Sequence, residues 1–336
     1  MIMLASFIIP SYNASTTIVR CLDSIYALGL SEQEFEVICI DDCSKDDTID
    51  VIEQYAKQHT NLTLLSQAEN HRQGAARNRG VTIAKGKYIV YVDSDDESDK
   101  GLLLALQLAE THNLDMVAMH YVNVDEHGNL SEKEMIQLDR VFTGVEMQTM
   151  HPYWGTAPWP YIFKADFLKK VNYPFVEDVV FEDSDYVNVH LYHAQRMMYN
   201  PVSSYRVHYN SQSTTHTMSY KHVADYLLLG TRMLKFYNSF PEKNSKYALS
   251  ILEGGSYNIW MSCKRMVKLP TMRDVQMLYD RVDHYTNRFD LLSYTEPAYC
   301  WTRWTKLCLA HKRIAICIIA IGILVYKIKG FLFSKR

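Results

Sequence analysis

The acidic segment Asp93-Ser94-Asp95 directly follows the apolar run Tyr88–Val92. In an extended segment alternate side chains point the same way, so Asp93 and Asp95 can face one ligand. Neighbouring carboxylates repel each other unless a cation compensates them, and a hard divalent ion such as Mg²⁺ or Mn²⁺ suits oxygen ligands and bridges substrate phosphates. The alternative is a solvated acidic loop, because two further acids follow. The spacing alone leaves both interpretations open.

A second acidic pair, Asp41-Asp42, follows the apolar run Phe35–Ile40. A carboxylate at the end of a strand can accept a hydrogen bond from a ribose hydroxyl or from a base N–H. Asp46 and Asp47 lie just before a helix-length segment and are typical N-cap residues. We therefore assign Asp41 to ligand contact and the later two acids to capping.

A third acidic pair, Glu182-Asp183, follows the apolar residues Val179–Phe181. A carboxylate at a helix start after an apolar run can be partly desolvated, which raises its pKa towards a value useful for a general base. The alternative is that the pair only caps a helix over Tyr186–Leu191. The residues by themselves do not decide between a base and a cap.

The segment Asn70–Gly80 combines basic and small residues at the start of an expected helix. Gly74 permits close backbone approach, and Arg77 is placed to reach a diphosphate or a base. The segment matches neither the GxGxxG fingerprint nor the Walker A loop, which disfavours those nucleotide sites. Taken singly, Arg72, Arg77 and Arg79 are equally compatible with a solvated helix surface.

The elements that position these residues alternate between short apolar runs and amphipathic helix-length segments. Continuous apolar strands indicate a sheet covered on both faces, and the alternation with helices indicates right-handed βαβ units. Ligands bind at the carboxyl ends of such strands, where the first strand continues into Pro10-Ser11-Tyr12. We expect strands over 5–9, 35–40, 62–66, 88–92 and 116–121, and helices over 15–28, 47–59, 73–84, 100–111, 222–236 and 272–284.

Composition restricts the class of protein. The chain is 48% apolar and 22% charged, which excludes disorder, collagen and coiled coil as whole-chain descriptions. The seven cysteines are odd in number and lack CxxC spacing, so we expect neither a disulfide framework nor a structural zinc site. Residues 1–10 have no basic region of the kind that begins a signal peptide and are read as a buried strand, which favours the cytoplasmic side.

The charge is distributed unevenly. The net charge is 35 − 38 = −3, but no acid follows Glu296 and eight Lys and Arg residues do, so the last forty residues carry +8 and the rest carries −3 − 8 = −11. The uncharged stretch Ile314–Tyr326 would cover about 20 Å as a helix, short of the ~30 Å hydrocarbon core. Neighbouring Trp and basic residues favour an anionic membrane surface, with interfacial or re-entrant contact. The alternative is a C-terminal helix buried in the core or in a dimer interface.

Together these motifs resemble, in order and spacing, the family 2 glycosyltransferases of GT-A fold, which are inverting, nucleotide-sugar-dependent enzymes. The resemblance is strong over residues 3–100 and looser over 150–215. It implies an α/β fold with a Rossmann-like, mostly parallel central sheet flanked by helices, followed by a helical C-terminal region. The matching segments are Phe7–Asn13, Ile40–Thr48, Asn70–Gly80, Gly86–Asp96 and Phe181–Asp183.

The resemblance implies roles for these residues in donor binding. Tyr12 would stack on uracil or another base, Asp41 would hydrogen-bond that base, and Arg77 would contact the nucleotide. Asp93 would meet the ribose or a divalent cation (Mn or Mg), and Asp95 would ligate the cation bridging the diphosphate. Three further residues, Pro10, Ser11 and Ser94, would complete the nucleotide-sugar site.

The resemblance also implies how the acceptor reacts. Asp183 would be the general base that removes the proton of the acceptor hydroxyl, and Glu182 would hold Asp183 or the acceptor. Trp159 lies where such enzymes place an acceptor-site aromatic, with core packing as the alternative. Arg206 or His208 would neutralise the leaving diphosphate. Attack from the opposite face gives a single displacement with inversion.

We therefore expect a glycosyltransferase that uses a nucleotide-diphosphate sugar, with UDP-sugars the favoured class, and a glycan or lipid-linked acceptor in surface polysaccharide synthesis. The expected organisation is a nucleotide-sugar-binding half (1–120), an acceptor and base half (121–215), a helical region (216–299) and a membrane-associating tail (300–336). We expect peripheral or monotopic association on the cytoplasmic side, no nucleic-acid partner, and leave an oligomer open. The alternatives are a non-catalytic nucleotide-sugar-binding subunit and a nucleotidyltransferase, which lacks the expected N-terminal Gly-rich, Arg-containing loop.

Overall fold

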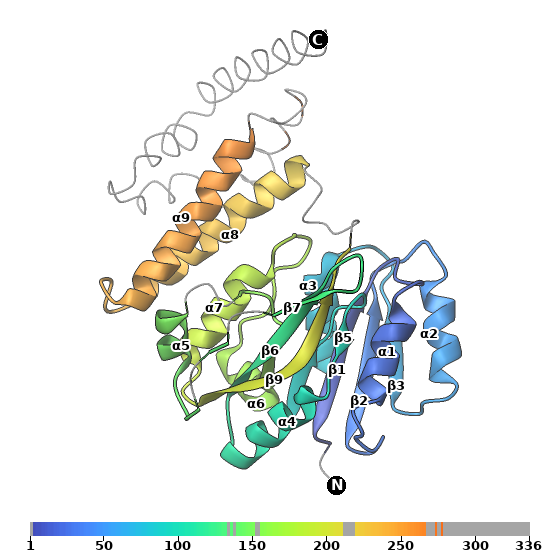
Figure 1. Cartoon of the computed structure of the whole chain (residues 1–336). Helices are drawn as coiled ribbons and strands as arrows, with labels where there is room; N and C mark the ends of the chain where they lie inside the picture. Colours follow the sequence, from blue (N-terminus) through green and yellow to red (C-terminus); the bar gives the residue numbers. More distant parts are fainter. Residues whose placement is uncertain are drawn as a thin grey trace. The chain divides into compact units, whose positions relative to one another are not determined.

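The computed structural model describes residues 3–132, 135–136, 139–151, 155–210 and 219–266, together with positions 273 and 277. The chain divides into two compact units, Met1–Gln212 and Ser213–Arg336. The first unit contains a nine-stranded mixed sheet with helices packed against it (Figure 1). The expected boundary at 120/121 falls within strand β6 (Met116–Val124), so the two halves of the first unit share one sheet.

The N-terminal part of the sheet is parallel, with the strand order β3-β2-β1-β4. Every residue of β1 and β2 is buried, which agrees with their continuous apolar sequences. The first two helices connect β1 to β2 and β2 to β3, which lie on one side of β1. The third helix connects β3 to β4, which lies on the other side of β1. The strand order therefore reverses between β1 and β4, where open α/β sheets bind ligands. These elements are β1 (Ala5–Ser11), α1 (Ile18–Tyr26), β2 (Phe35–Asp41), α2 (Thr48–Ala56), β3 (Leu62–Ser66), α3 (Arg72–Ile83) and β4 (Tyr88–Tyr91).

The second part of the sheet is mixed. Strand β8 (Tyr161–Lys164) lies antiparallel between β4 and β6, and β9 (Met197–His208) runs parallel to β6. The short strand β5 (Glu97–Ser98) pairs antiparallel with β9, which brings the segment after β4 next to Arg206. The predicted parallel order thus describes the first four strands, while the later strands close the sheet around them. The remaining elements of this unit are α4 (Gly101–His112), β7 (Leu130–Glu132), α5 (Gly144–Met150), α6 (Ala165–Val171) and α7 (Asp183–His193).

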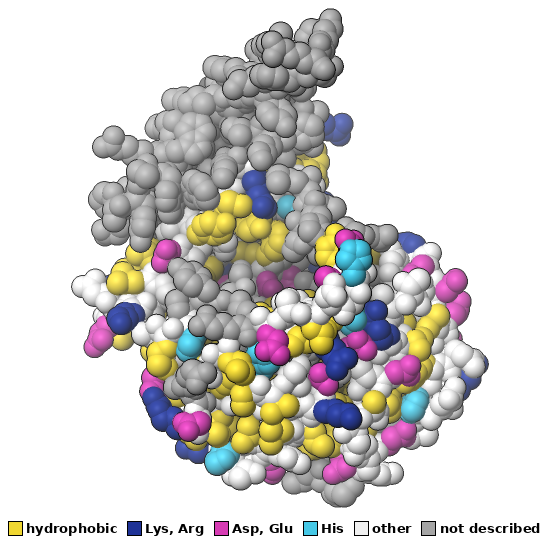
Figure 2. All heavy atoms as spheres, viewed as in Figure 1, with side chains coloured by type: hydrophobic (Ala, Val, Ile, Leu, Met, Phe, Trp, Pro, Cys, Tyr) yellow, Lys and Arg dark blue, Asp and Glu magenta, His cyan; other side chains and the backbone are white. Residues whose placement is uncertain are grey.

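The expected strands and helices of the first 121 residues are confirmed, with helix ends that differ by a few residues. The helix expected over 15–28 begins at Ile18, because residues 15–17 form a turn held by the Ala14 carbonyl, which accepts from the Thr17 and Ile18 amides. On the face shown in Figure 2, acidic and basic side chains of the first unit are interspersed.

The second unit contains two long helices, α8 (Tyr220–Ser239) and α9 (Lys246–Met266). They pack closely at glycines: a Cβ added at Gly230 would lie 2.7 Å from the carbonyl oxygen of Gly255. The helix expected over 222–236 is therefore confirmed within α8. The helix expected over 272–284 and the tail over 300–336 lie outside the described residues. Within the part of the chain that is described, no helix has both the length and the apolar character needed to cross a membrane.

Candidate active site

The loops after β1 and β2 are fastened to each other at the point where the strand order reverses. Ser11 pairs with Asp41 in the sheet. The Asn13 amide donates to Ser44 Oγ at 2.9 Å, and the Lys45 amide donates to Asn13 Oδ1 at 2.7 Å. These bonds fix the backbone on either side of the residues predicted to bind the nucleoside.

At this edge of the sheet the Asp41 side chain is buried, whereas the Tyr12 side chain is exposed to solvent. Asp41 is buried, and its Oδ2 accepts from the Ser44 amide at 3.0 Å. Its Oδ1 is also buried and has no hydrogen-bond partner among the described residues, so it is free to accept a bond from a ligand N–H or O–H. Tyr12 is 46% exposed and offers a ring face for stacking, while Pro10 and Ser11 are buried and shape the strand end from within.

The turn after β4 is organised by a hydroxyl from β9. The Asp93 amide donates to Tyr205 Oη at 2.9 Å, and that hydroxyl donates to Asp96 Oδ2 at 3.0 Å. The His208 amide donates to the other oxygen of Asp96 at 2.8 Å. Burial and the charges of Asp93 and Asp95 raise the pKa of Asp96 well above its usual range. Asp96 and Tyr205 therefore hold the turn, and sequence reasoning had assigned no role to either.

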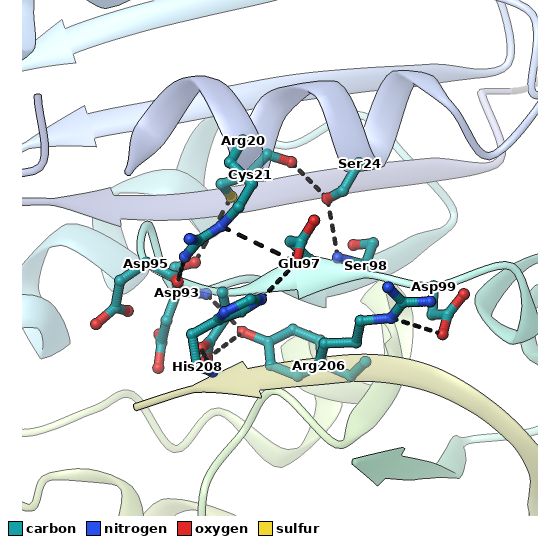
Figure 3. Close-up of polar contacts among 12 residues, drawn as sticks. Arg20, Cys21, Ser24, Asp93, Asp95, Glu97, Ser98, Asp99, Arg206 and His208 are labelled. Carbon is teal, nitrogen blue, oxygen red and sulfur yellow. Dashed lines mark hydrogen bonds and ion pairs between the residues drawn. The ribbon is translucent and has the colours of Figure 1, made fainter. Parts of the chain in front are cut away.

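Asp93 and Asp95 lie side by side at the end of β4 (Figure 3). Burial and the neighbouring charge of Asp93 raise the pKa of Asp95, although the Asn210 side chain donates to Asp95 Oδ2 at 2.8 Å. Arg20 donates to the Asp95 carbonyl at 2.5 Å and so bonds the backbone, not the carboxylate. Asp93 Oδ1 is paired with Arg77, whereas the Asp95 carboxylate forms no ion pair among the described residues, so the two acids together still carry an excess of negative charge that fits a divalent cation.

The carboxylate pair cannot by itself complete a cation's coordination shell. In the described ranges no group of three or more His, Cys, Asp or Glu residues is placed to hold a metal ion. A cation at Asp93 and Asp95 would therefore take its remaining ligands from a bound substrate or from water. This is the arrangement expected for an ion that bridges substrate phosphates.

Arg77 is buried, with 1% of its side chain exposed. One terminal nitrogen donates to Asp93 Oδ1 at 2.7 Å, and the other donates to Glu182 Oε1 at 2.5 Å. The guanidinium also lies over the ring of Phe175, with its carbon 5.4 Å from the centroid. The alternative of a solvated helix surface is wrong for Arg77, and its predicted contact with the nucleotide stays a prediction.

Glu182 and Asp183 lie at the start of α7, as the sequence predicted. Glu182 occupies the N-cap position, but its side chain makes no capping bond and instead pairs with Arg77. Burial and the charge of Glu182 raise the pKa of Asp183 from 3.8 to about 7, outweighing the opposing effect of Arg77. A carboxylate with this pKa can accept a proton near neutral pH. Glu182 therefore does not cap the helix through its side chain, and the role of Asp183 as general base stays a prediction.

The residues predicted to contact the acceptor side are largely engaged within the protein. Trp159 is partly buried and stacks on Tyr205 with ring centroids 4.7 Å apart, which agrees with the core-packing alternative. Arg206 donates to Asp99 Oδ2 at 3.0 Å and extends towards it in Figure 3, and His208 pairs with Glu97. Their contact with an acceptor or a leaving group stays a prediction. Ser94 is partly buried in the turn between the two acids.

The family model described as Glycosyl transferase family 2 matches residues 6–173. The uncharacterized glycosyltransferase EpsJ of Bacillus subtilis (strain 168) is 31% identical over 195 residues, which are 55% of this chain and 55% of EpsJ. The uncharacterized glycosyltransferase YibD of Escherichia coli (strain K12) is 27% identical over 228 residues, 65% of each chain. The matches thus span less than two thirds of either relative.

The fold resembles solved structures over most of the length of this chain. The crystal structure of S. aureus TarS 1–349 in complex with UDP-GlcNAc superposes with a TM-score of 0.66 at 20% identity. The superposition covers 91% of this chain and 89% of that one. At this identity the likeness establishes the GT-A fold.

Proposed function

Because the chain belongs to glycosyl transferase family 2, we propose that it transfers a sugar from a nucleotide-diphosphate sugar to an acceptor hydroxyl with inversion. The observation that carries this proposal is Asp183, a carboxylate at a helix start whose pKa is raised to about 7. It lies in the same buried charge network as Asp93, because Arg77 bonds both Asp93 and the neighbouring Glu182. A proton acceptor beside a donor-binding acidic turn is what glycosyl transfer requires.

The donor would bind across the edge where β1, β2 and β4 end. Tyr12 stacks on the base, and the free Oδ1 of Asp41 accepts a bond from it. UDP-sugars are the favoured class, and the TarS structure of the same fold was solved in complex with UDP-GlcNAc. A relative from Bacillus spizizenii, 41% identical over 95 residues, is named a poly(ribitol-phosphate) beta-glucosyltransferase. That name supports a polymeric acceptor, and we propose a surface glycan or a lipid-linked sugar as the acceptor here.

Asp93 and Asp95 would hold a Mn²⁺ or Mg²⁺ ion with the donor diphosphate. When bound, such an ion stabilises the negative charge that develops on the departing nucleoside diphosphate. Tyr205 keeps the turn in place by bonding the Asp93 amide. The contribution of the protein is therefore to present the two carboxylates in a fixed geometry.

Asp183 then accepts the proton of the acceptor hydroxyl at its carboxylate as that oxygen attacks the anomeric carbon. The bond between the anomeric carbon and the diphosphate oxygen breaks, and its electron pair leaves with the nucleoside diphosphate. Attack occurs from the face opposite the leaving group, so the configuration inverts. Glu182 stays paired with Arg77 and holds the start of α7.

A screen of nucleotide sugars tests this proposal in two stages. Thermal denaturation with and without Mn²⁺ identifies the donor, because a bound ligand stabilises the folded state. Release of nucleoside diphosphate is then measured, with poly(ribitol phosphate) and with water as the sugar acceptor, for the wild type, Asp183→Asn and the control Asp166→Asn, an exposed acid in the first turn of α6. We expect Asp183→Asn to bind the donor and release none, while the control matches the wild type.

Each alternative predicts a different result in that screen. Stabilisation by no nucleotide sugar contradicts the proposal. Donor binding without release by the wild type supports a non-catalytic subunit, and release of pyrophosphate supports a nucleotidyltransferase. Full release by Asp183→Asn shows that the base is a different residue.

We also propose that residues 300–336 bring the protein to an anionic membrane surface on the cytoplasmic side. The proposal depends on the eight basic residues and the apolar stretch found there in the sequence. Co-sedimentation of the full chain with anionic and with neutral lipid vesicles tests it. Equal recovery of the chain with both kinds of vesicle would argue against an electrostatic surface anchor.

A further inference from the structure

Building on the proposed function, we propose that Arg77 is a positioning residue that fixes the general base relative to the donor site. Its guanidinium joins Asp93, at the end of β4, to Glu182, directly before Asp183. The two carboxylates belong to segments 89 positions apart in the sequence, and this one side chain bonds both of them. The donor end and the acceptor end of the reaction thus share one buried ion.

The bridge is short, and solvent is largely excluded from it. Its bonds measure 2.7 Å to Asp93 and 2.5 Å to Glu182. Arg77 is 1% exposed and Glu182 is fully buried. A planar guanidinium presents its donors in a fixed fork, so it specifies the relative placement of two carboxylates in a way that a single ammonium group cannot. Low exposure strengthens these bonds because water does not compete for them.

Helix α3, which carries Arg77, is packed closely against the loop that precedes Glu182 and Asp183. A Cβ added at Gly74 would lie 2.6 Å from the Val176 carbonyl oxygen and 2.9 Å from Glu182 Cγ. The Asn78 side chain donates to the Phe175 carbonyl at 2.9 Å and accepts from the Phe175 amide at 3.0 Å. The part of α3 that carries Arg77 is therefore fastened to this loop on both sides of Arg77.

This role differs from direct contact between Arg77 and the nucleotide. The two terminal nitrogens already serve carboxylates, and the buried Nε has no hydrogen-bond partner within the described residues. Direct contact predicts weaker donor binding when Arg77 is removed. Positioning predicts donor binding that is kept and turnover that is lost, because a base misplaced by about 1 Å can cost about 100-fold in rate.

The test compares Arg77→Met and Arg77→Lys with Arg79→Met, a matched control. Arg79 lies on the same helix, and within the described ranges its side chain bonds only the Ser66 carbonyl, at 2.9 Å. With the donor from the screen above, Arg77→Met should lower kcat about 100-fold, and Arg77→Lys should recover part of that loss. The Kd for UDP, measured by calorimetry without Mn²⁺ so that the charge removed beside Asp93 does not act through a bound ion, should stay within about twofold of the wild type. A weaker Kd with unchanged kcat would overturn the proposal in favour of direct contact.

A double-mutant cycle tests whether Arg77 acts through Glu182. If it does, Arg77→Met combined with Glu182→Gln should be no slower than the slower single variant, within about twofold. Rate losses that multiply in the double variant would show independent roles and would contradict the proposal. The cycle also guards against a simple folding defect, because the conservative Glu182→Gln change keeps the side-chain shape.

Hydrogen exchange separates failure of this inference from failure of the proposed function. In Arg77→Met, amides 186–190, the first of α7 with an acceptor inside the helix, should exchange faster than in Arg79→Met, relative to the amides of β1. Unchanged exchange there would overturn the positioning role even if no donor is found. If the wild type releases no nucleoside diphosphate from any donor, the proposed function fails. The hydrogen-exchange measurement then still tests whether Arg77 holds the start of α7 in place.

Discussion

Replacing Asp183 by asparagine should abolish turnover and at the same time make the folded protein more stable at neutral pH. Burial and the charge of Glu182 raise the pKa of Asp183 from 3.8 to about 7, so the fold disfavours the ionised form that catalysis needs. Asparagine has nearly the same shape and carries no charge. The variant should therefore relieve a cost that the wild type bears for its function.

The size and sign of this effect follow from proton linkage. The difference between about 7 and 3.8, at about 1.4 kcal/mol for each pH unit, corresponds to about 4 kcal/mol. Above pH 7 the carboxylate is ionised in both the folded and the unfolded state, and the folded state bears the whole cost. Between pH 7 and 3.8 the folded state takes up the proton first, so the cost shrinks as the pH falls. Near pH 4 and below, the cost is gone.

The assay is urea denaturation of the wild type, Asp183→Asn and the exposed control Asp166→Asn at pH 8, 6 and 4.5. The stability advantage of Asp183→Asn should be largest at pH 8 and should decline at each lower pH, while the control stays level with the wild type. Turnover of the wild type should fall below pH 7, as Asp183 becomes protonated. Equal stability of the wild type and Asp183→Asn at pH 8 would refute this account of the pKa.

Two further substitutions test the hydrogen bonds that hold the turn after β4 and the close packing of α3. Tyr205→Phe removes the hydroxyl that joins the Asp93 amide to Asp96, so it should cost about 1–3 kcal/mol and reduce turnover, as measured by thermal denaturation and nucleoside diphosphate release. A variant as stable and active as the wild type would show that the turn is held without this hydroxyl. Gly74→Ala places a methyl group within 2.6 Å of the Val176 carbonyl oxygen. We expect the free energy of unfolding to fall by about 1–3 kcal/mol and turnover to slow. Unchanged stability and turnover would exclude the close packing described for α3.

Much of the N-terminal half could be predicted because its signals are local. An apolar run buried on both faces identifies β1 or β2 from a few consecutive residues, and the polar residue after it marks the ligand-binding edge. This is why Asp41 and Asp93 could be placed at the ends of their strands without a structure. The same reasoning placed Asp183 at a helix start, where α7 begins.

The mixed half of the sheet could not be predicted in this way. β8 inserts antiparallel between β4 and β6, and that pairing joins segments about 70 residues apart. A periodicity of two residues identifies a strand but carries no information about its neighbour. For the same reason the contacts of Arg206 with Asp99 and of His208 with Glu97, which strand pairing brings about, were not predicted, while the expected contact of these residues with a leaving group stays a prediction.

The sequence by itself determined the family of folds, the acidic strand ends and the candidate base, because each depends on residues close together in the chain. Only the tertiary structure decided what surrounds them. It showed that Arg77 is buried between Asp93 and Glu182, that Tyr205 holds the acidic turn, and that Asp183 has a raised pKa. These properties depend on burial and on charges brought together from distant segments, and neither is encoded in local spacing.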